Sequence, residues 1–528
     1  MPKVLISDKL SPAAVEIFRA RGVEVDVKTG LSAADLRAII GEYDGLAIRS
    51  ATKVTKEVLE TATNLKVVGR AGIGVDNVDI KSATARGVVV MNTPNGNAIT
   101  TAEHAIAMMF ALARQIPEAS ASTKAGKWEK NRFMGVELTG KVLGVIGCGN
   151  IGSIVADRAI GLKMRVVAYD PYLTDKRARD IGVEKIELAD LIARADIITL
   201  HTPLTDQTRN IISRDALARA KKGVRIINCA RGGLVDEAAL AEALKSGHVA
   251  GAALDVFEVE PAKESPLFAL ENVVCTPHLG ASTTEAQENV ALQIAEQMSD
   301  FLLTGAVSNA INMPSVSAED APRLKPYMEL CRSLGAFAGQ LTTAQHSAIK
   351  AVTIEYEGAA AGLNTKPLTA AALAGLMGPM MEGANMVNAP VLAHDRGIEV
   401  SETIHDRPSE YQTLVRISVV TDTQTRGVAG TLFAGSRPRI VEIKGIPVEA
   451  DFARHMLYVT NQDKPGFIGR FGAVLSEAGI NIATFHLGRA EAGGDAICLV
   501  SIDEEPSEEV LKAVRALPLV VQAAPLSF

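Results

Sequence analysis

Three side chains of complementary chemistry follow strand-like runs in the middle of the chain, namely Arg231, Glu260 and His278. Histidine exchanges protons near neutral pH because its unperturbed pKa is about 6.5. A neighbouring carboxylate favours the imidazolium form of a histidine, and the forked guanidinium of arginine is a natural bidentate partner for a carboxylate. The three residues are therefore candidates for taking the hydroxyl proton, supporting the base and holding the carboxylate of a 2-hydroxy acid.

His201 competes with His278 for the proton-transfer role, because it also follows a strand-like run. It lacks an obvious acidic partner. Taken one at a time, the three candidates could also be a surface arginine, a solvated glutamate and a core histidine. Their combination favours the catalytic interpretation, and we expect His104, which lies in a predicted helix, to be structural.

A glycine-rich motif, Gly-Cys-Gly-Asn-Ile-Gly at 147–152, lies between a strand-like run at 142–146 and a predicted helix. Glycines at these positions let the backbone approach a pyrophosphate at a helix N-terminus, where free N–H groups and the helix dipole favour anions. Asp170 follows about 20 residues further on, where an acidic side chain accepts hydrogen bonds from the adenosine ribose. Its charge would repel a 2′-phosphate, so the motif predicts NAD rather than NADP, although Lys176 and Arg177 weaken that preference.

The composition is that of an ordinary globular chain. Of the 528 residues, 47% are hydrophobic and 22% are charged, and this length predicts about three to four domains. The net charge of −7 argues against nucleic acid as a partner, since phosphate binding needs a basic surface. The five cysteines are scattered and form no Cys-x-x-Cys pair, which predicts free thiols, no metal site and a reducing cytoplasm. No helical apolar run is long enough to span a bilayer.

Alternating strand and helix patterns must position these residues. Residues 1–98 and 141–280 both show repeated strand–helix units, which predict two parallel sheets covered by helices. Ligands bind at the carboxyl ends of the strands in such sheets. Two capping boxes, at 100–103 and 282–285, predict helices that form the hinge between the two lobes, and the second helix is expected to end near Gly305.

The remainder of the chain predicts two further domains behind a linker at 308–322. Residues 323–451 contain alanine- and glycine-rich helices and two strand-like stretches, and residues 452–528 predict a βαββα unit. The expected fold class is α/β, with two Rossmann-like parallel-sheet lobes, an α+β intervening domain and a small regulatory domain. The expected boundaries are 1–98 with 285–310 for a substrate-binding lobe, 99–284 for a dinucleotide-binding lobe, 320–451 for the intervening domain and 452–528 for the last domain.

The glycine-rich motif and the set of Arg231, Glu260 and His278 resemble the D-isomer-specific 2-hydroxyacid dehydrogenase family over about residues 1–310. The resemblance implies that these three residues have the roles given above and that NAD is the cofactor. The acidic residue at 260 differs from the glutamine of the similar formate dehydrogenases. The cofactor contacts of the family map onto Gly147, Gly149, Asn150, Ile151, Gly152, Asp170, Thr202, Cys229, Ala230, Asp255, Gly280 and Ala281.

Two segments of the first lobe, 49–55 and 69–77, are similar to substrate-binding signatures of long family members that oxidise D-3-phosphoglycerate in the first step of L-serine synthesis. Backbone N–H groups at 72–74 could bind a carboxylate, and the arginines could reach a phosphate, unless they are surface ion-pair partners. The segment 128–132 resembles one that lends a basic residue to a neighbouring subunit, which implies a homodimer or homotetramer. The implied substrate-binding residues are Arg49, Arg70, Gly72, Ile73, Gly74, Asn97 and Arg132.

The C-terminal unit resembles the ACT domain, a sensor of small molecules that commonly binds amino acids. Asn461, Asp463 and Asn481 match positions that bind L-serine in the long members, which implies feedback regulation by L-serine. The same unit could instead serve assembly alone. Two other functions stay open: a related dehydrogenase acting on glycerate, hydroxypyruvate or 2-oxoglutarate, and an NAD-sensing binding protein similar to the corepressors that share this fold.

Overall fold

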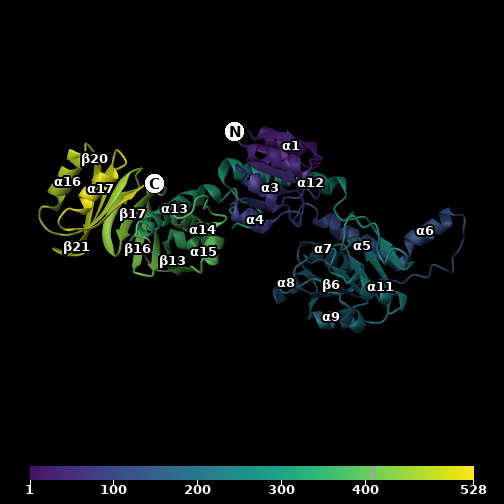
Figure 1. Cartoon of the computed structure of the whole chain (residues 1–528). Coiled ribbons are helices and arrows are strands. Elements are labelled where there is room, and N and C mark those ends of the chain that lie inside the picture. Colours follow the sequence, from purple (N-terminus) through teal and green to yellow (C-terminus); the bar gives the residue numbers. More distant parts are fainter. Residues whose placement is uncertain (346, 406–409) are drawn as a thin grey trace.

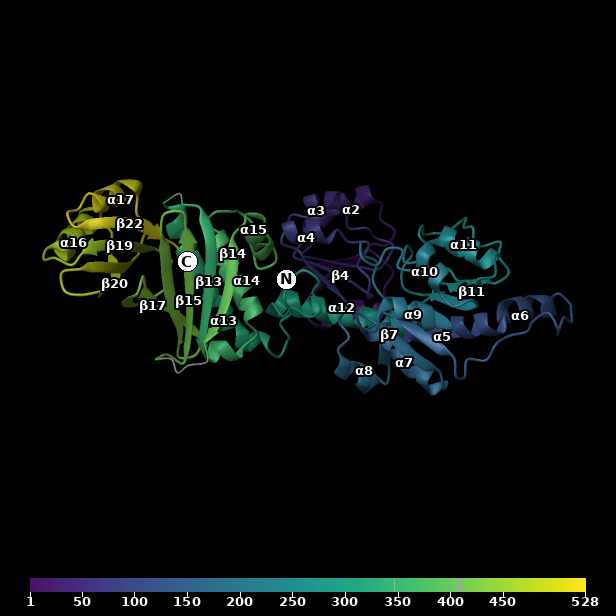
Figure 2. The same cartoon turned by 90° about the horizontal axis from the view of Figure 1, so that it is seen from below.

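The computed structural model describes residues 1–345, 347–405 and 410–528, which form four units arranged in a row (Figure 1). The N-terminal lobe and the dinucleotide lobe are neighbours, connected by the helices α5 (Ala98–Arg114) and α12 (Thr284–Thr304). The intervening unit lies on the other side of the N-terminal lobe, and the C-terminal unit forms the far end of the row (Figure 2). At the opposite end, α6 (Ile116–Lys124) projects from the dinucleotide lobe. Among the described helices, none is long and apolar enough to cross a membrane.

The N-terminal lobe is built on a five-stranded parallel sheet with the order β2-β1-β3-β4-β5. Helices cover both faces of the sheet, α1 and α12 on one and α2, α3 and α4 on the other, so its inner strands are mainly apolar, whereas the edge strand β2 alternates polar and apolar residues. The elements are β1 (Lys3–Ile6), α1 (Pro12–Ala20), β2 (Glu24–Val27), α2 (Ala33–Ile39), η1 (Ile40–Glu42), β3 (Gly45–Ile48), α3 (Lys56–Thr61), β4 (Val67–Arg70), α4 (Ile80–Ala85) and β5 (Val89–Asn92).

The dinucleotide lobe contains a seven-stranded parallel sheet with the order β12-β11-β10-β9-β6-β7-β8. Helices α5 and α7 cover one face, and α9, α10 and α11 cover the other. The six predicted strands are present, and β8 is an additional short edge strand. The elements are β6 (Val142–Ile146), α7 (Asn150–Gly161), β7 (Arg165–Tyr169), α8 (Asp175–Ile181), β8 (Glu184–Lys185), α9 (Leu188–Arg194), β9 (Ile197–Leu200), α10 (Arg214–Arg219), β10 (Val224–Asn228), α11 (Glu237–Lys245), β11 (Val249–Leu254) and β12 (Val273–Cys275).

The two connecting helices begin at residues other than those predicted. α5 begins at Ala98, so the predicted capping residue Thr100 lies inside its first turn. α12 is capped by Thr283 and not by Ser282, since the hydroxyl of Thr283 accepts the N–H of Ala286 at 3.2 Å. The prediction for α12 was wrong by one residue because several hydroxyl residues occur in a row there, and any of them can cap a helix. α5 instead follows Asn97, whose side chain forms no capping hydrogen bond.

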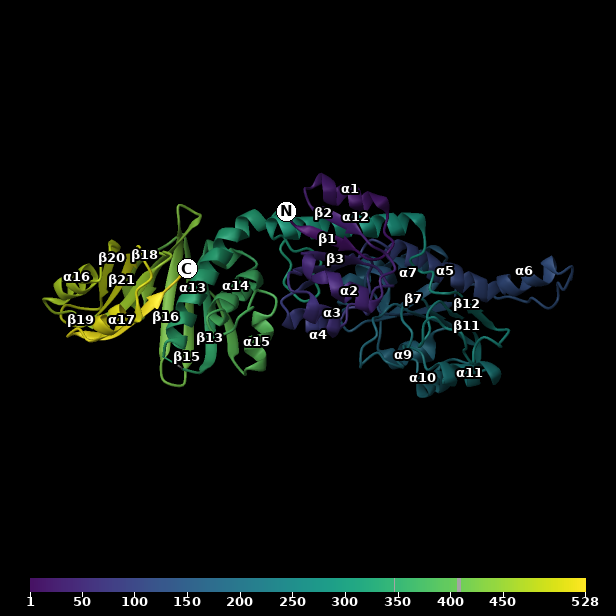
Figure 3. The same ribbon diagram turned by 45° about the horizontal axis from the view of Figure 1, so that its top comes forward.

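α12 returns the chain to the N-terminal lobe (Figure 3). Its residues Ile294 and Met298 are fully buried in the core of that lobe. The helix ends before Gly305, as predicted, and Gly305 has a φ of 77°, a conformation that favours glycine. The two lobes are therefore linked twice, and a change in their relative position must be accommodated at α5 and α12.

The intervening unit contains a six-stranded mixed sheet with the order β14-β13-β15-β16-β17-β18, where only two strands were predicted. Helices α13 and α14 cover one face, and glycines let them approach closely: a Cβ on Gly335 would lie 2.1 Å from the carbonyl oxygen of Ala372. The regular alternation of polar and apolar residues in β13 is a strand signal that the helix-rich composition of the region obscured. The elements are α13 (Ala321–Thr343), β13 (Ile349–Gly358), η2 (Ala359–Gly362), α14 (Thr365–Met377), α15 (Ala389–Asp395), β14 (Glu399–His405), β15 (Thr413–Thr421), β16 (Thr425–Phe433), β17 (Arg437–Ile443) and β18 (Ile446–Asp451).

The C-terminal unit has an antiparallel sheet with the order β20-β21-β19-β22, and its element order is βαββαβ. The last strand was missed because it contains Pro525, which an edge strand tolerates. The unit shares one hydrophobic core with the intervening unit, in which the rings of Tyr458 and Phe337 meet edge to face at 5.8 Å. The elements are β19 (Met456–Gln462), α16 (Phe467–Glu477), β20 (Ile482–Arg489), β21 (Asp495–Ile502), α17 (Glu508–Arg515) and β22 (Val520–Leu526).

Candidate active site

Three neighbouring parallel strands bring the catalytic candidates to one edge of the dinucleotide lobe. Arg231 follows β10, Glu260 lies in the loop after β11, and His278 follows β12. Because β12, β11 and β10 are adjacent in the sheet, their carboxyl ends are adjacent as well. The sheet therefore brings together side chains that are far apart in the sequence.

His278 and Glu260 form a hydrogen-bonded pair, with 2.6 Å between Nδ1 of His278 and Oε2 of Glu260. This hydrogen bond raises the pKa of His278, against the opposing effect of burial. Burial disfavours the charged form of Glu260, but hydrogen bonds from His278 and from the N–H of Phe257 outweigh it and lower the pKa of the carboxyl group. His278 is 52% exposed, and its Nε2 has no hydrogen-bond partner among the described residues. The pair therefore presents a basic ring nitrogen to a bound ligand.

The buried carboxylate of Asp255 holds the loop that carries His278. Its oxygens accept the backbone N–H groups of Leu279 and Gly280 at 2.7 and 2.8 Å. Nε2 of His104, on α5, lies 3.2 Å from the same carboxylate. Burial opposes the charge of Asp255, but its hydrogen bonds with His104 and the loop lower its pKa below the usual value. His104 therefore supports the loop and does not contact the His278–Glu260 pair.

Arg231 connects the two lobes. Its Nε donates to Asp76 of the N-terminal lobe at 2.9 Å, and its Nη1 donates to the carbonyl of Ala230 at 2.7 Å. The guanidinium lies so close to Gly74 that a Cβ at that position would come within 1.7 Å of Nη2. Asp76 is a site residue that the sequence analysis missed, although it lies within the 69–77 segment and is an acidic residue near a candidate arginine.

Arg49, Arg70 and Arg231 form a cluster of positive charge near the junction of the lobes. Burial lowers the pKa of Arg70 to about 10, and the charges of Arg231 and Arg49 act in the same direction. Nε of Arg70 is buried without a hydrogen-bond partner in the described part of the chain. The adjacent Gly72 has a φ of 144°, and a Cβ there would collide with the Arg70 guanidinium. Because a buried guanidinium needs a partner, the cluster suits an anionic ligand.

Ile73 and Asn97, the other predicted substrate residues of this lobe, contribute in different ways. The carbonyl of Ile73 accepts the side-chain amide of Asn92 at 2.6 Å. Asn97 precedes α5, and its Oδ1 is buried without a hydrogen-bond partner among the described residues. Asn97 therefore has an acceptor available for a ligand, whereas the Ile73 carbonyl is already engaged.

His201 occupies a different environment from His278. It is partly buried directly after β9, and its Nε2 lies 2.9 Å from the hydroxyl of Thr199. Its Nδ1 is buried without a hydrogen-bond partner among the described residues, and removal of the ring from solvent lowers its pKa to about 3. A neutral imidazole without an acidic partner is poorly suited to proton transfer at neutral pH, so the geometry favours His278.

The glycine-rich loop leaves room for a dinucleotide where β6 meets α7. Gly147 and Gly152 allow close packing, since a Cβ on Gly152 would lie 2.0 Å from the carbonyl oxygen of Gly147. Gly149 faces open space, because a Cβ added there would have no atom of another segment within 4 Å. The first turn of α7 has no side-chain cap, so its N–H groups are available to a phosphate. The loop therefore fits the pyrophosphate of NAD.

Asp170 lies beside this loop, directly after β7. Its carboxylate accepts the N–H groups of Cys148 and Tyr172, both at 2.8 Å. A carboxylate has about four lone-pair sites, so acceptor capacity remains for ribose hydroxyls. Asn150, in the first turn of α7, donates to the side chain of Asn95 in the N-terminal lobe at 2.9 Å. The region around the glycine-rich loop is therefore hydrogen-bonded both to Asp170 and to the N-terminal lobe.

The remaining cofactor candidates lie in the same region. Thr202 follows β9, and its backbone nitrogen would lie 3.0 Å from a Cβ on Gly147. Cys229 is buried, which raises the pKa of its thiol. The other candidates are Ile151 in the first turn of α7, Ala230 after β10, and Gly280 and Ala281 after β12.

Arg132 does not contact the other candidates within its own chain. It lies on the segment that follows α6 and forms ion pairs with Glu129 and Glu271 at 3.2 and 3.3 Å. Its side chain also lies over the ring of Phe133. A role at a substrate site would therefore require a second copy of the chain.

The three effector candidates have separate partners in the C-terminal unit. Asp463 accepts the guanidinium of Arg489 at 2.9 Å and the N–H of Gly493 at 3.1 Å. Asn481 donates to Asp503 at 2.8 Å. Asn461 is buried in β19 and donates to the carbonyl of Gln462 at 2.9 Å. No direct contact joins the three side chains in the described structure.

Family models match most of the chain. Residues 106–280 match the NAD binding domain of D-isomer specific 2-hydroxyacid dehydrogenases, residues 323–444 match the D-3-phosphoglycerate dehydrogenase intervening domain, and residues 455–519 match the ACT domain. Among solved structures, the TT0316 protein from Thermus thermophilus is 35% identical with a TM-score of 0.54, covering 58% of this chain and 99% of that one. D-lactate dehydrogenase from Aquifex aeolicus, complexed with NAD and lactic acid, is 25% identical with a TM-score of 0.53, covering 59% of this chain and 100% of that one.

Curated relatives match nearly the full length. D-3-phosphoglycerate dehydrogenase of Bacillus subtilis is 43% identical over 99% of this chain and 98% of its own. The enzyme of the same name from Archaeoglobus fulgidus is 42% identical over 99% of each chain. The similarity therefore covers both lobes and both C-terminal units. The chain belongs to the D-3-phosphoglycerate dehydrogenase family.

Proposed function

We propose that this chain oxidises D-3-phosphoglycerate to 3-phosphohydroxypyruvate with NAD, the first step of L-serine synthesis. The observation that carries the proposal is the 2.6 Å pair of His278 and Glu260, which lies on the lobe that bears the dinucleotide loop. The relatives named D-3-phosphoglycerate dehydrogenase support the choice of substrate.

His278 is the base for the C2 hydroxyl of the substrate. Its Nε2 takes the proton while Nδ1 stays hydrogen-bonded to Glu260, whose charge stabilises the imidazolium that forms. Arg231 holds the substrate carboxylate and polarises the developing carbonyl group. Bound NAD supplies the acceptor for the hydride that leaves C2.

The arginine cluster is the proposed site for the phosphate group. Arg49 and Arg70 would pair with it, together with the basic residue of a neighbouring subunit. The phosphate would satisfy the buried Nε of Arg70, which has no other partner in the described chain. A substrate without a phosphate would leave that donor unpaired, so the site should discriminate strongly between the two.

L-serine is the proposed effector of the C-terminal unit. Hydrogen bonds from the N–H of Gly493 and from Arg489 lower the pKa of Asp463, so its carboxylate is charged and available to an amino group. Asn461 and Asn481 would supply the amide groups for the rest of the amino acid. The core shared with the intervening unit is a physical connection to the remainder of the chain.

A homodimer is the proposed minimal assembly. The projecting helix α6 and the segment after it carry large exposed apolar side chains, including Trp128 at 87% exposure and Met134. Exposed apolar groups on a projecting segment are typical of an interface. A second copy would cover them, and Arg132 would then lie near the partner's substrate site; further contacts could produce a tetramer.

A reducing compartment, the cytoplasm, is the proposed location. The five cysteines are all free thiols, and burial raises the pKa of Cys498 to about 12. Four of these thiols are buried and Cys275 is exposed, and free thiols without disulfides are typical of such a compartment.

Replacing His278 with alanine should lower kcat about 10²- to 10⁴-fold, because general base catalysis contributes an effect of that size. NAD binding should persist, since the dinucleotide loop is unchanged. Steady-state kinetics and NAD titration measure the two effects, with His201→Asn as the matched histidine control. Near-normal turnover of His278→Ala would refute its role as the base.

Glu260→Gln should shift the pH dependence of oxidation. The neutral form of His278 is the active base, so activity falls as the pH drops through its raised pKa. Without the carboxylate this pKa should fall toward its ordinary value, and the acid limb of the kcat/KM profile should move to lower pH while the maximal rate decreases. An acid limb at the same pH in both proteins would show that Glu260 does not set the pKa of the base.

The choice of substrate is tested by NADH oxidation with phosphohydroxypyruvate and with hydroxypyruvate, each with and without L-serine. We expect rapid turnover of the phosphorylated compound alone, inhibited by L-serine. Arg49→Gln should raise KM for the phosphorylated compound about tenfold or more, because a charge-assisted hydrogen bond is lost. Equal turnover of hydroxypyruvate would refute the phosphate site, and insensitivity to L-serine would refute the effector assignment alone.

Mixed assemblies test whether Arg132 acts in the neighbouring subunit. Arg132→Ala and His278→Ala chains should each be poorly active alone. Co-expressed with different tags, they should form mixed dimers in which one site has both His278 and the partner's Arg132. Random pairing of equal amounts would restore about a quarter of the native sites. Activity of the mixture equal to the mean of the separate variants would contradict the shared site.

A further inference from the structure

A guanidinium is buried without partners where the intervening and C-terminal units meet. Arg426, on β16, is 5% exposed, and its Nε, Nη1 and Nη2 have no hydrogen-bond partner among the described residues. Removing a charged group from water without replacing its hydrogen bonds is strongly unfavourable. Burial accordingly lowers the pKa of Arg426. A partner from outside the chain would remove this penalty.

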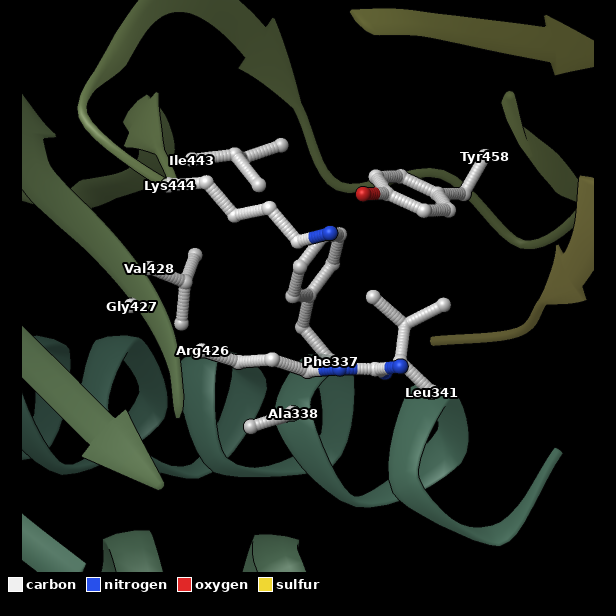
Figure 4. A pocket seen from close by; sticks show the side chains of 9 residues that line it. All are labelled: Phe337, Ala338, Leu341, Arg426, Gly427, Val428, Ile443, Lys444 and Tyr458. Carbon is white, nitrogen blue, oxygen red and sulfur yellow. The ribbon is translucent and has the colours of Figure 1, made fainter. Parts of the chain in front are cut away.

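Two further donors converge on the same place. Tyr458, on β19 of the C-terminal unit, is fully buried, and its hydroxyl has no partner among the described residues. Lys444 lies in the turn between β17 and β18, and its ammonium and the Tyr458 hydroxyl point toward one another (Figure 4). Burial raises the pKa of Tyr458 to about 12, so its hydroxyl stays protonated and can donate. Partial burial and the charge of Arg426 lower the pKa of Lys444.

No acidic side chain of the described residues contacts Arg426 or Lys444. Neither Arg426 nor Lys444 forms an ion pair with another described residue, and Asp495 acts on Lys444 only through longer-range attraction. The other residues that line the space offer no polar side chain: Phe337, Ala338, Leu341, Gly427, Val428 and Ile443. Three donors line this space, two of them cationic, and they favour an anion, because a neutral water would leave the buried charge of Arg426 uncompensated.

The space admits only a small ion. Its volume is about 10 Å³, which is room for a single water-sized group. A phosphate ester or an amino acid is too large for it, so this space is distinct from the proposed substrate and effector sites. Lys444 is also accessible to solvent, which provides a route of entry.

We propose that Arg426, Lys444 and Tyr458 bind a small monovalent inorganic anion, of the size of chloride. Arg426 and Lys444 belong to the intervening unit and Tyr458 to the C-terminal unit, so the ion contacts both. An ion that binds only the packed arrangement stabilises it increasingly as the ion concentration rises above the Kd. The ion therefore strengthens the docking of the C-terminal unit onto the rest of the chain.

Thermal unfolding of the full-length protein tests the proposal. Sodium gluconate, whose anion is too large for the space, is replaced at constant ionic strength by sodium chloride in one series and by sodium bromide in another. We expect the unfolding temperature to rise with the logarithm of the concentration of at least one small anion once that concentration exceeds the Kd, and the two series identify which ion binds. Lys444→Gln should raise the concentration at which this rise begins about tenfold or more, because one charged partner is lost.

Lys350→Gln is the matched control, because Lys350 is an exposed lysine at the start of β13 outside this space, and it should respond as the native chain does. Equal stability in gluconate and in both small anions would overturn the proposal, as would an unchanged response of Lys444→Gln. Tyr458→Phe provides a second variant that keeps the packed ring and removes the donor.

Crystals of the full chain soaked in sodium bromide give a direct measurement, because bromide is a chloride-sized anomalous scatterer. An anomalous peak within hydrogen-bond distance of Arg426 and Lys444 is expected. Absence of a peak there, together with peaks elsewhere on the surface, would overturn the assignment. Neither readout depends on turnover, so the outcome is independent of the proposed substrate.

Discussion

The carboxylate of Asp255 is the contact on which the geometry of the active site depends. It is fully buried at the end of β11, and a buried charge is tolerated only when it is paired and hydrogen-bonded. The loop after β12 folds back to supply those hydrogen bonds from Leu279 and Gly280. That folding places His278 against Glu260. The proton-transfer pair is thus positioned by a group that takes no part in the proposed proton transfer.

The charge distribution near the lobe junction complements this arrangement. Burial lowers the pKa of Arg70, the nearby charges of Arg231 and Arg49 lower it further, and Asp76 forms an ion pair with Arg231. The arginines of the two lobes repel one another as the lobes approach, unless an anion lies between them. An anionic substrate would therefore both fill the site and favour closure of the two lobes. The connecting helices α5 and α12 are the elements that would accommodate such a movement.

The C-terminal unit lies far from the dinucleotide lobe of the same chain, so an influence on catalysis within one chain must pass through the intervening unit and the N-terminal lobe (Figure 1). The structure shows contacts along this route. A single hydrophobic core joins the last two units, and Asn385 and Asn388 of the intervening unit donate to the carbonyls of Gly87 and Ala85 in the N-terminal lobe. Energetic coupling between distant sites requires such elements to have two arrangements. These junctions are where a second arrangement should be sought.

The sequence by itself determined the features that depend on local chemistry: the strands of the dinucleotide lobe, which are short apolar runs between turns, and the glycine-rich loop. It also singled out Glu260 and His278, because an acid and a histidine after neighbouring strands have complementary chemistry. Only the tertiary structure decided which hydroxyl caps α12, that β14 pairs with β13, and that Asp76 contacts Arg231. It likewise revealed the unpaired guanidinium of Arg426. These features depend on pairing and burial between residues far apart in the chain, and neither residue type nor spacing specifies them.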